Sequence, residues 1–406
     1  MFRTVLFDVD GVLLSEERYF DATALTVHEL CFSANFLDLT AALTVPFTPA
    51  PTEEQMRAIR AQVMDGDRAL HHMKSRGINA NWDMVYLLFA WQFAELCRFG
   101  EVHRFHQVAA EDVDQRGSTT VKKTLRDGGA RREKLRVWMV RMAEVVRAKG
   151  AVYHPDFHAF VQVVDTCSNK SELFAAVNSA LQTALGAHWF ASLPEDLWEL
   201  GREVFQQWYL GDEYLMEQSS TSGPLHVHKT GKRGFLRDEV AIVDMQKLAD
   251  ILKQLAARGV TLGIATGRPE LETKVPLEAL GILSYFDANR ISTASDVLVA
   301  EAECPQAAPL SKPHPYSYLR SLMGRSQPAE LLETVLPVPR EVGEATLIVG
   351  DSVADALAAR ALGCRFAAVL TGPAGDLARK EFEDLQADYI LADVLELAKI
   401  GGCKVL

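Results

Sequence analysis

The chain has 406 residues, of which 48% are hydrophobic and 24% charged, and its formal net charge is −12 at pH 7. This composition is typical of a globular protein large enough for two or three domains, and it excludes a disordered or fibrous chain. The acidic balance argues against nucleic-acid binding as the main activity.

The opening segment, residues 4–14, is an apolar run that leads into two carboxylates. Its apolar residues are continuous rather than alternating, which predicts a strand buried on both faces of a parallel sheet. Asp8 and Asp10 follow this run, and Gly11 permits a tight turn that keeps both carboxylates close to one substrate. Because open α/β sheets carry their chemistry at the carboxyl ends of strands, this is a candidate site. Alternatively, one aspartate only caps the next turn.

From Ser15 to about residue 235, apolar residues recur at helical spacing and strand-like runs are sparse. Thr52 is a predicted N-cap, and Gln55 would complete a capping box. Residues 218–234 are predicted to be a linker or exposed hairpin. The result is an all-α insertion of about 220 residues, large enough to bury its own core. Its helices are predicted over residues 16–30, 52–73, 81–99, 131–148, 171–185 and 194–210.

After residue 240 the pattern changes to alternating strands and helices, which predicts a parallel, doubly wound sheet. The opening strand has no partner within the helical region, so we expect it to pair with these later strands. The predicted fold is therefore α/β, with a Rossmann-like core made of residues 1–14 and 236–406 and an all-α domain over residues 15–235. Strands are predicted over residues 260–265, 290–293, 346–349, 366–370 and 389–391, and helices over 245–258, 270–280, 316–323, 352–362, 374–385 and 394–399.

Polar residues that follow the predicted strand 260–265 are suited to an anion. The Thr266 hydroxyl and the backbone N–H groups of Gly267 and its neighbours could cradle phosphate oxygens. The alternative is that Thr266 caps the helix after Pro269. Arg268 could touch the phosphate or its leaving group, or could be an exposed surface residue.

Two later segments carry the remaining candidate residues. Lys312 precedes a proline, and a fixed ammonium can neutralise a phosphoryl group, although a solvated loop lysine is the simpler alternative. Asp351 ends a predicted strand and Asp355 lies one turn into the next helix, so both could face one cation. Mg²⁺ prefers a few hard oxygen ligands and keeps its waters, which suits such a pair. Alternatively, these aspartates only stabilise the helix N-terminus.

In this order, these residues resemble the motifs of the haloacid dehalogenase superfamily, in its phosphatase branch. The resemblance implies that Asp8 is a nucleophile that becomes an aspartyl-phosphate and that Asp10 is the general acid and then the general base. It also implies that Thr266, Gly267, Arg268 and Lys312 hold the phosphoryl group. Mg²⁺ would be bound by Asp8, the backbone carbonyl of Asp10 and Asp351, with Asp355 acting directly or through water. The segments that match are Asp8-Val9-Asp10-Gly11-Val12, Thr266-Gly267-Arg268, Lys312-Pro313 and Gly350-Asp351-Ser352 with Asp355.

The expected activity is Mg²⁺-dependent hydrolysis of a small phosphate monoester. A phosphosugar mutase would use the same aspartates, and a binding module without activity would not need them. A haloacid dehalogenase is the least favoured enzyme, because a halide leaves without the proton that Asp10 could supply. The helical insertion is much longer than the caps at this position in the family, and we expect it to close over the site and select the substrate.

The remaining expectations concern partners and location. We expect a small phosphorylated metabolite as the partner, and neither a nucleic acid nor a membrane. Residues 82–96 are the most apolar later segment, but Asp83, Gln92 and Glu95 interrupt them. No signal peptide is recognised, and six scattered cysteines without CxxC spacing indicate reduced, mostly buried thiols of a cytoplasmic protein.

Overall fold

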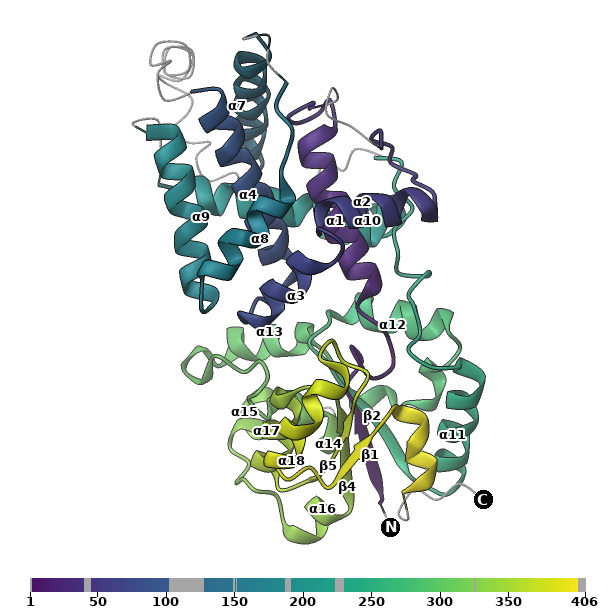
Figure 1. The fold of residues 1–406 in the computed structure, drawn as a ribbon. Helices are drawn as coiled ribbons and strands as arrows, with labels where there is room; N and C mark the ends of the chain where they lie inside the picture. The colour runs from purple at the N-terminus through teal and green to yellow at the C-terminus, as the bar shows by residue number, and fades with distance from the viewer. Residues whose placement is uncertain are drawn as a thin grey trace. The chain divides into compact units, whose positions relative to one another are not determined.

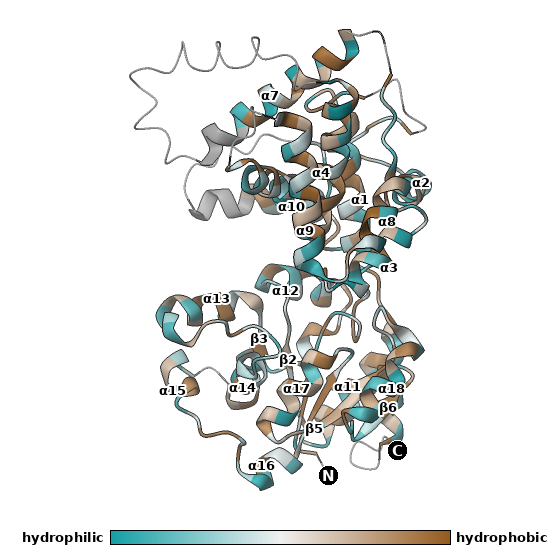
Figure 2. Ribbon diagram, turned by 60° about the vertical axis from the view of Figure 1, so that its left-hand side comes forward, coloured by the Kyte–Doolittle hydropathy of each residue, from teal (hydrophilic) through white to brown (hydrophobic). Residues whose placement is uncertain are grey.

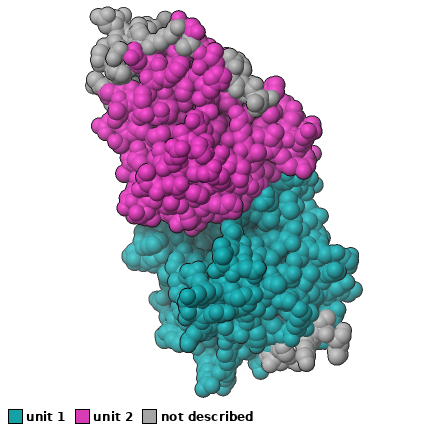
Figure 3. All heavy atoms as spheres, in the orientation of Figure 1, with its two compact units in different colours: residues 1–18, 236–406 teal, residues 19–235 magenta. Residues whose placement is uncertain are grey.

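A computed structural model describes residues 2–39, 45–101, 128–148, 150, 152–186, 191–222, 230–324 and 326–400. The chain divides into two compact units, which Figure 3 colours separately. The core unit consists of Met1–Arg18 and Leu236–Leu406, and the helical unit consists of Tyr19–Phe235.

The core unit is built on a parallel sheet, which has six strands within the described residues, in the order β3-β2-β1-β4-β5-β6. The opening strand β1 lies inside the sheet, with Leu6 opposite Gly263 of β2 on one side and Ile348 of β4 on the other. The predicted doubly wound parallel sheet is therefore confirmed, including the pairing of the opening strand with strands far along the chain. The strands are β1 Thr4–Phe7, β2 Thr261–Ala265, β3 Ile291–Ser292, β4 Thr346–Gly350, β5 Arg365–Val369 and β6 Tyr389–Leu391.

Helices cover both faces of this sheet (Figure 1). Val5 and Phe7 belong to one hydrophobic cluster, with residues of α11 (Met245–Ala257) and the 3₁₀ helix η8 (Val394–Lys399). Leu6 belongs to a second cluster on the opposite face. Burial on both faces explains why the strand is continuously apolar, and Figure 2 shows strands coloured largely as hydrophobic. The second face is covered by α13 (Ala294–Glu303), α14 (Tyr316–Met323), α15 (Pro328–Leu332), α17 (Val353–Leu362) and α18 (Arg379–Asp384).

Several core elements differ from the prediction. The predicted helix 374–385 is a 3₁₀ turn, η7 (Gly375–Ala378), followed by α18, and residues 394–399 are 3₁₀ rather than α-helical. Helix α13 was not expected, although Thr293 and Asp296 form a capping box at its start. The remaining elements are α12 (Glu270–Ala279), α16 (Arg340–Glu344), η4 (Leu283–Tyr285), η5 (Ala288–Arg290) and η6 (Pro305–Ala307).

The helical unit is organised around α4, which contacts α7, α8, α9 and α10. Nearly every α4 side chain between Asp83 and Cys97 is buried, so this aromatic helix is the core of the unit. The described helices are α1 Glu17–Phe32, α2 Glu53–Val63, α3 Arg68–Ser75, α4 Asn81–Phe99, α7 Gly128–Ala148, α8 Phe157–Thr166, α9 Lys170–Leu185 and α10 Leu193–Ser222.

The predicted helix 52–73 is wrong, because the chain breaks into α2 and α3. The predicted capping box is present at the start of α2. The break falls where Asp65, Gly66 and Asp67 all have a positive φ, which no helix accommodates.

The predicted linker 218–234 is partly wrong, because α10 continues to Ser222, past a non-helical kink at Gly211. A Cβ on Gly211 would lie 2.5 Å from the Arg233 carbonyl, so this glycine permits two backbone segments to approach closely. Residues 223–229 of the predicted linker lie outside the described residues.

Within the described part of the chain, no helix is both long and apolar enough to cross a membrane. The cysteines at positions 31, 97, 167, 304 and 364 are all unpaired and buried, as the scattered spacing indicated. Cys403 lies outside the described residues.

Candidate active site

The strands β1 and β4 bring the first and last predicted motifs together. Phe7 lies opposite Val349, and the Asp8 N–H donates to the Val349 carbonyl at 2.9 Å. Both strands are parallel and end at the same edge, so Asp8 and Asp351 emerge side by side. Asp8, Asp351 and Asp355 each offer a carboxylate oxygen, and these oxygens lie within 4.8 Å of one another. Three hard oxygen donors at this spacing suit a divalent cation such as Mg²⁺.

Asp8 is buried, with 8% of its surface exposed. Its Oδ1 accepts from the Val9 N–H at 2.7 Å, and its Oδ2 lies 3.0 Å from the Lys312 ammonium. Burial raises the pKa of Asp8 to about 7, against the opposing effect of Lys312. An ionised Asp8 therefore depends on positive charge beside it.

Lys312 supplies positive charge to two carboxylates. Its Nζ lies 3.0 Å from Asp8 Oδ2 and 2.8 Å from Asp355 Oδ1. Burial lowers the pKa of Lys312, but Asp355 and Asp8 raise it by more, so the pKa stays above its ordinary value. The lysine remains charged, and the alternative of a solvated loop lysine is wrong.

Asp355 is fully buried and holds Lys312 in place. Its Oδ1 also accepts from the Tyr318 hydroxyl at 2.9 Å, and its Oδ2 accepts from the Ser352 hydroxyl at 2.7 Å. Burial raises the pKa of Asp355, but Lys312 and these hydrogen bonds lower it by more, so its pKa is depressed. Asp355 also completes a capping box with Ser352. It therefore caps the helix and contacts Lys312 at the same time.

Sequence reasoning missed Tyr318. Its hydroxyl accepts from Lys312 Nζ at 3.3 Å, and the ammonium also lies 4.7 Å from the ring centroid. Its position on α14 repeats the apolar spacing of a core helix, which hides the hydroxyl's role from a search for charged or nucleophilic residues.

Two glycines enclose the Asp351 carboxylate. A Cβ built on Gly11 would lie 2.0 Å from Asp351 Oδ2, and one on Gly372 would lie 2.2 Å from the same oxygen. Gly11 also has a φ of 70° and is held by the Thr371 hydroxyl, which donates to its carbonyl at 2.5 Å. Burial, followed by the charges of Asp355 and Asp8, raises the pKa of Asp351 well above its ordinary value. A bound cation would offset this crowding of negative charge.

The second motif follows β2. Thr266 is buried, its N–H donates to the Ser292 carbonyl at 3.0 Å, and its hydroxyl accepts from the Arg268 N–H at 3.1 Å. The N-cap of α12 is Pro269, so the alternative that Thr266 caps this helix is wrong. Gly267 is exposed, and among the described residues its backbone N–H has no acceptor.

Arg268 is buried rather than exposed, so the surface alternative is wrong. Its guanidinium lies between two carboxylates, with Nε 2.7 Å from Asp10 Oδ1 and Nη1 2.7 Å from Glu239 Oε1. The Asp10 carboxylate therefore faces Arg268 and is not one of the three carboxylates grouped around Asp8. Sequence reasoning missed Glu239, because a lone acidic residue at the end of a long insertion has no recognisable pattern.

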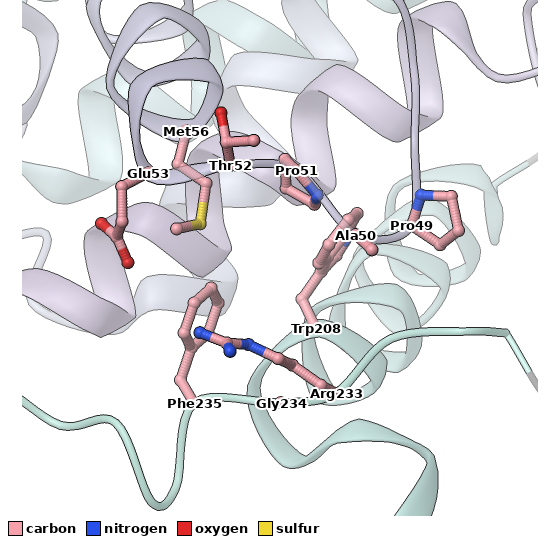
Figure 4. Close-up of a pocket in the computed structure, with 10 residues that line it drawn as sticks. All are labelled: Pro49, Ala50, Pro51, Thr52, Glu53, Met56, Trp208, Arg233, Gly234 and Phe235. Carbon is pink, nitrogen blue, oxygen red and sulfur yellow. The ribbon is translucent and has the colours of Figure 1, made fainter.

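A pocket of about 340 Å³ lies within the helical unit (Figure 4). None of the residues predicted from the motifs lines it. Its walls combine apolar and aromatic side chains with the charged residues Glu53 and Arg233. The lining residues are Pro49, Ala50, Pro51, Thr52, Glu53, Met56, Trp208, Arg233, Gly234 and Phe235.

A parallel sheet with carboxylates and a lysine gathered at its carboxyl edge is the arrangement that α/β enzymes use for their sites. A family model of the haloacid dehalogenase-like hydrolases matches residues 148–363, more than half of the chain. The chain belongs to this family. The match contains Thr266, Lys312 and Asp351, whereas Asp8 precedes it.

A solved X-ray structure of a Northeast Structural Genomics Consortium target is 32% identical, with a TM-score of 0.81, covering 98% of this chain and 97% of that one. A conserved haloacid dehalogenase-like protein from Agrobacterium tumefaciens is 14% identical, with a TM-score of 0.35 and coverage of 98% and 97%. A predicted phosphoglycolate phosphatase from Haemophilus somnus is 19% identical, with a TM-score of 0.30 and coverage of 57% and 76%. The search of curated proteins found no match.

The glycines around Asp351 give a direct test of the site. We expect Gly11→Ala to lower hydrolytic activity about 100-fold, because the new Cβ must displace the Asp351 carboxylate. Gly259→Ala is the matched control, since Gly259 also has a positive φ, of 77°, but nothing lies within 4 Å of its would-be Cβ. Both variants should lose about 1 kcal/mol of stability from the left-handed backbone. Equal activity in the two variants, measured with thermal unfolding alongside, would contradict the proposed place of Asp351.

Proposed function

We propose that this protein is a Mg²⁺-dependent phosphatase that hydrolyses a small phosphorylated metabolite through an aspartyl-phosphate on Asp8. The observation that carries the proposal is the meeting of three motifs, in which Asp8 lies 3.0 Å from Lys312 and within 4.8 Å of Asp351. We further propose that residues 1–14 and 236–406 form the catalytic core and that residues 15–235 form its cap.

The chemistry begins with attack of the Asp8 carboxylate on phosphorus. Lys312 offsets the negative charge of both the nucleophile and the phosphoryl group, and Asp355 and Tyr318 keep the ammonium in place. Asp10 gives a proton to the leaving oxygen and then takes one from the water that hydrolyses the aspartyl-phosphate. Asp10 is suited to this contact because 30% of its side chain is exposed, in contrast to the buried Asp8.

The phosphoryl oxygens would be held at the end of β2 by Thr266, Gly267 and Lys312. The Gly267 N–H supports this role, because the residue is exposed and its N–H has no acceptor among the described residues. A backbone donor of this kind binds anions without the desolvation cost of a buried charge.

The donor set fits Mg²⁺, since it consists of carboxylate oxygens and one of them lies in a cradle that any Cβ would fill. Asp8, the Asp10 backbone carbonyl and Asp351 would hold the ion. Asp355 would act through water, because its oxygens already accept from Lys312, Tyr318 and Ser352. When bound, Mg²⁺ supplies positive charge that lessens the repulsion between an anionic nucleophile and an anionic substrate.

The test is a panel of phosphorylated metabolites and an aryl phosphate, assayed for phosphate release with Mg²⁺ and with a chelator. We expect the chelator to reduce the rate by about 100-fold or more and added Mg²⁺ to restore it. Phosphate release that is unaffected by chelation would contradict the metal site. Isomerisation of a sugar phosphate primed by its bisphosphate, without release of phosphate, would instead identify a mutase.

A further inference from the structure

We propose that Glu239 and Arg268 are positioning residues that orient the Asp10 carboxylate for proton transfer. This inference rests on the proposed phosphatase function, and it assigns Arg268 a role other than binding phosphate. We call the pair Glu239 and Arg268 the carboxylate clamp.

The clamp and Asp10 form a row of three charged groups, of which Glu239 and Arg268 are buried and Asp10 is partly exposed. Arg268 Nε and Nη2 lie 2.7 Å and 2.6 Å from the same atom, Asp10 Oδ1, and Arg268 Nη1 lies 2.7 Å from Glu239 Oε1. The side chains of Arg268 and Glu239 are each 1% exposed, whereas that of Asp10 is 30% exposed. Charge-assisted bonds of this length between buried groups fix geometry strongly.

The two carboxylate oxygens of Asp10 differ in their contacts with Arg268. Oδ1 accepts from Arg268 Nε and also lies 2.6 Å from Nη2, whereas none of the described residues donates to Oδ2. The guanidinium therefore holds Oδ1 in place, so Oδ2 is the oxygen that would meet the leaving group. Glu239 in turn prevents the guanidinium from turning away, because it binds the opposite edge of the same planar fork.

The same geometry argues against phosphate binding by Arg268. Its guanidinium is buried and already faces Asp10 on one edge and Glu239 on the other. To reach a phosphate, it would have to give up at least one of these charge-assisted contacts, which is costly for a buried cation.

The backbone that carries Glu239 is tied to the segment that follows Asp10. The Ser15 N–H donates to the Val240 carbonyl at 2.8 Å, and the Ile242 N–H donates to the Leu13 carbonyl at 3.3 Å. Glu239 comes directly before this pairing, so its backbone is held in a fixed place relative to the turn that carries Asp10. This local pairing gives the clamp a rigid base.

The clamp has a chemical signature that a merely structural role lacks. When the P–O bond to the leaving oxygen breaks, an alkoxide needs the proton carried by Asp10, whereas a dinitrophenolate is stable without it. The ratio kcat/KM reports only the steps up to departure of the leaving group. Loss of the clamp should therefore lower kcat/KM for an alkyl phosphate far more than for dinitrophenyl phosphate.

The experiment compares wild type with Glu239→Gln, Arg268→Lys and Asp10→Asn, using both substrates and the Mg²⁺-loaded protein. We expect each variant to lose about 100-fold in kcat/KM for the alkyl ester and no more than a few-fold for the aryl ester. Glu270→Gln, an exposed residue at the start of α12, is the control and should change neither value. Glu239→Asp should recover part of the alkyl activity, because it keeps the charge.

The outcomes separate this inference from the proposed function. If wild type hydrolyses both esters and the clamp variants lose both activities equally, or neither, the clamp is overturned while the phosphatase stands. If wild type hydrolyses neither ester, both proposals fall together. Thermal unfolding of each variant excludes misfolding as a cause, and Arg268→Lys retains the test if Glu239→Gln does not fold.

Discussion

Asp8→Asn is expected to reduce phosphate release by at least about 10⁴-fold, the largest effect of any single substitution in this chain. The amide has nearly the same shape as the carboxylate but cannot attack phosphorus. Asp250→Asn, an exposed residue on α11, is the matched control and should leave the rate unchanged. Retention of more than a small fraction of the activity by Asp8→Asn would remove Asp8 as the nucleophile.

The same variant should be more stable than wild type at neutral pH when metal is absent. Burial raises the pKa of Asp8 from 3.8 to about 7, so the folded protein binds more protons than the unfolded chain between these values. The free energy of unfolding therefore falls as the pH rises through this window. Asp8→Asn removes the part of this decrease that comes from ionisation of Asp8. Melting temperatures of the metal-free proteins should be similar at the acid end of the window and diverge toward its neutral end. A constant difference across the window would contradict this.

Lys312→Met is expected to cost both activity and stability. The substitution leaves Asp8 and Asp355 buried without their shared cation, and breaking such a pair costs about 3–5 kcal/mol. Activity should fall by about 1,000-fold, since Asp8 and the phosphoryl group would lose the positive charge of Lys312.

The stability loss from Lys312→Met should depend on pH. Lys312 lowers the pKa of both Asp8 and Asp355, so its removal raises these pKa values and disfavours folding most where the carboxylates must ionise. Urea unfolding of the variant should therefore show a larger loss near pH 8 than near pH 5. Lys253→Met, at an exposed position of α11, is the control. An equal loss of stability in the two variants would show that the ion pairs of Lys312 with Asp8 and Asp355 do not stabilise the fold.

The sheet could be predicted because its signal is local. The strands β1, β2 and β4 are short apolar runs followed at once by a polar residue, and strands that alternate with helices have few alternatives to a parallel sheet. The break between α2 and α3 was missed because apolar spacing continues across it, although the Asp65-Gly66 dipeptide at the break is typical of turns. Helical spacing indicates which residues face the core, but it does not report a change of helix direction.

The candidate site shows the same division. Asp8 and Asp351 could be singled out because carboxylates beside apolar strands are unusual without a partner or ligand. Lys312, in a loop before a proline, could be singled out only by its place in the order of the motifs. Tyr318 and Glu239 could not, since each lies in an ordinary local pattern and contacts residues that are distant in the sequence, Asp355 and Arg268 respectively. For Arg268 the motif predicted proximity to the site, but the direction of its guanidinium depended on a carboxylate that no motif contains.

The pairing of residues 13–15 with 240–242 has a consequence for how this chain could vary. The two ends of the helical insertion leave the sheet from adjacent backbone positions that are bonded to each other. Because these ends are bonded to each other, the insertion can be treated as a closed loop. The free-energy cost of closing such a loop rises only by about 0.6 kcal/mol for each doubling of its length. Insertions of very different size could be exchanged at this junction while the carboxylates on either side keep their spacing, and a chain cut back to a short linker between residues 15 and 240 should still form the sheet.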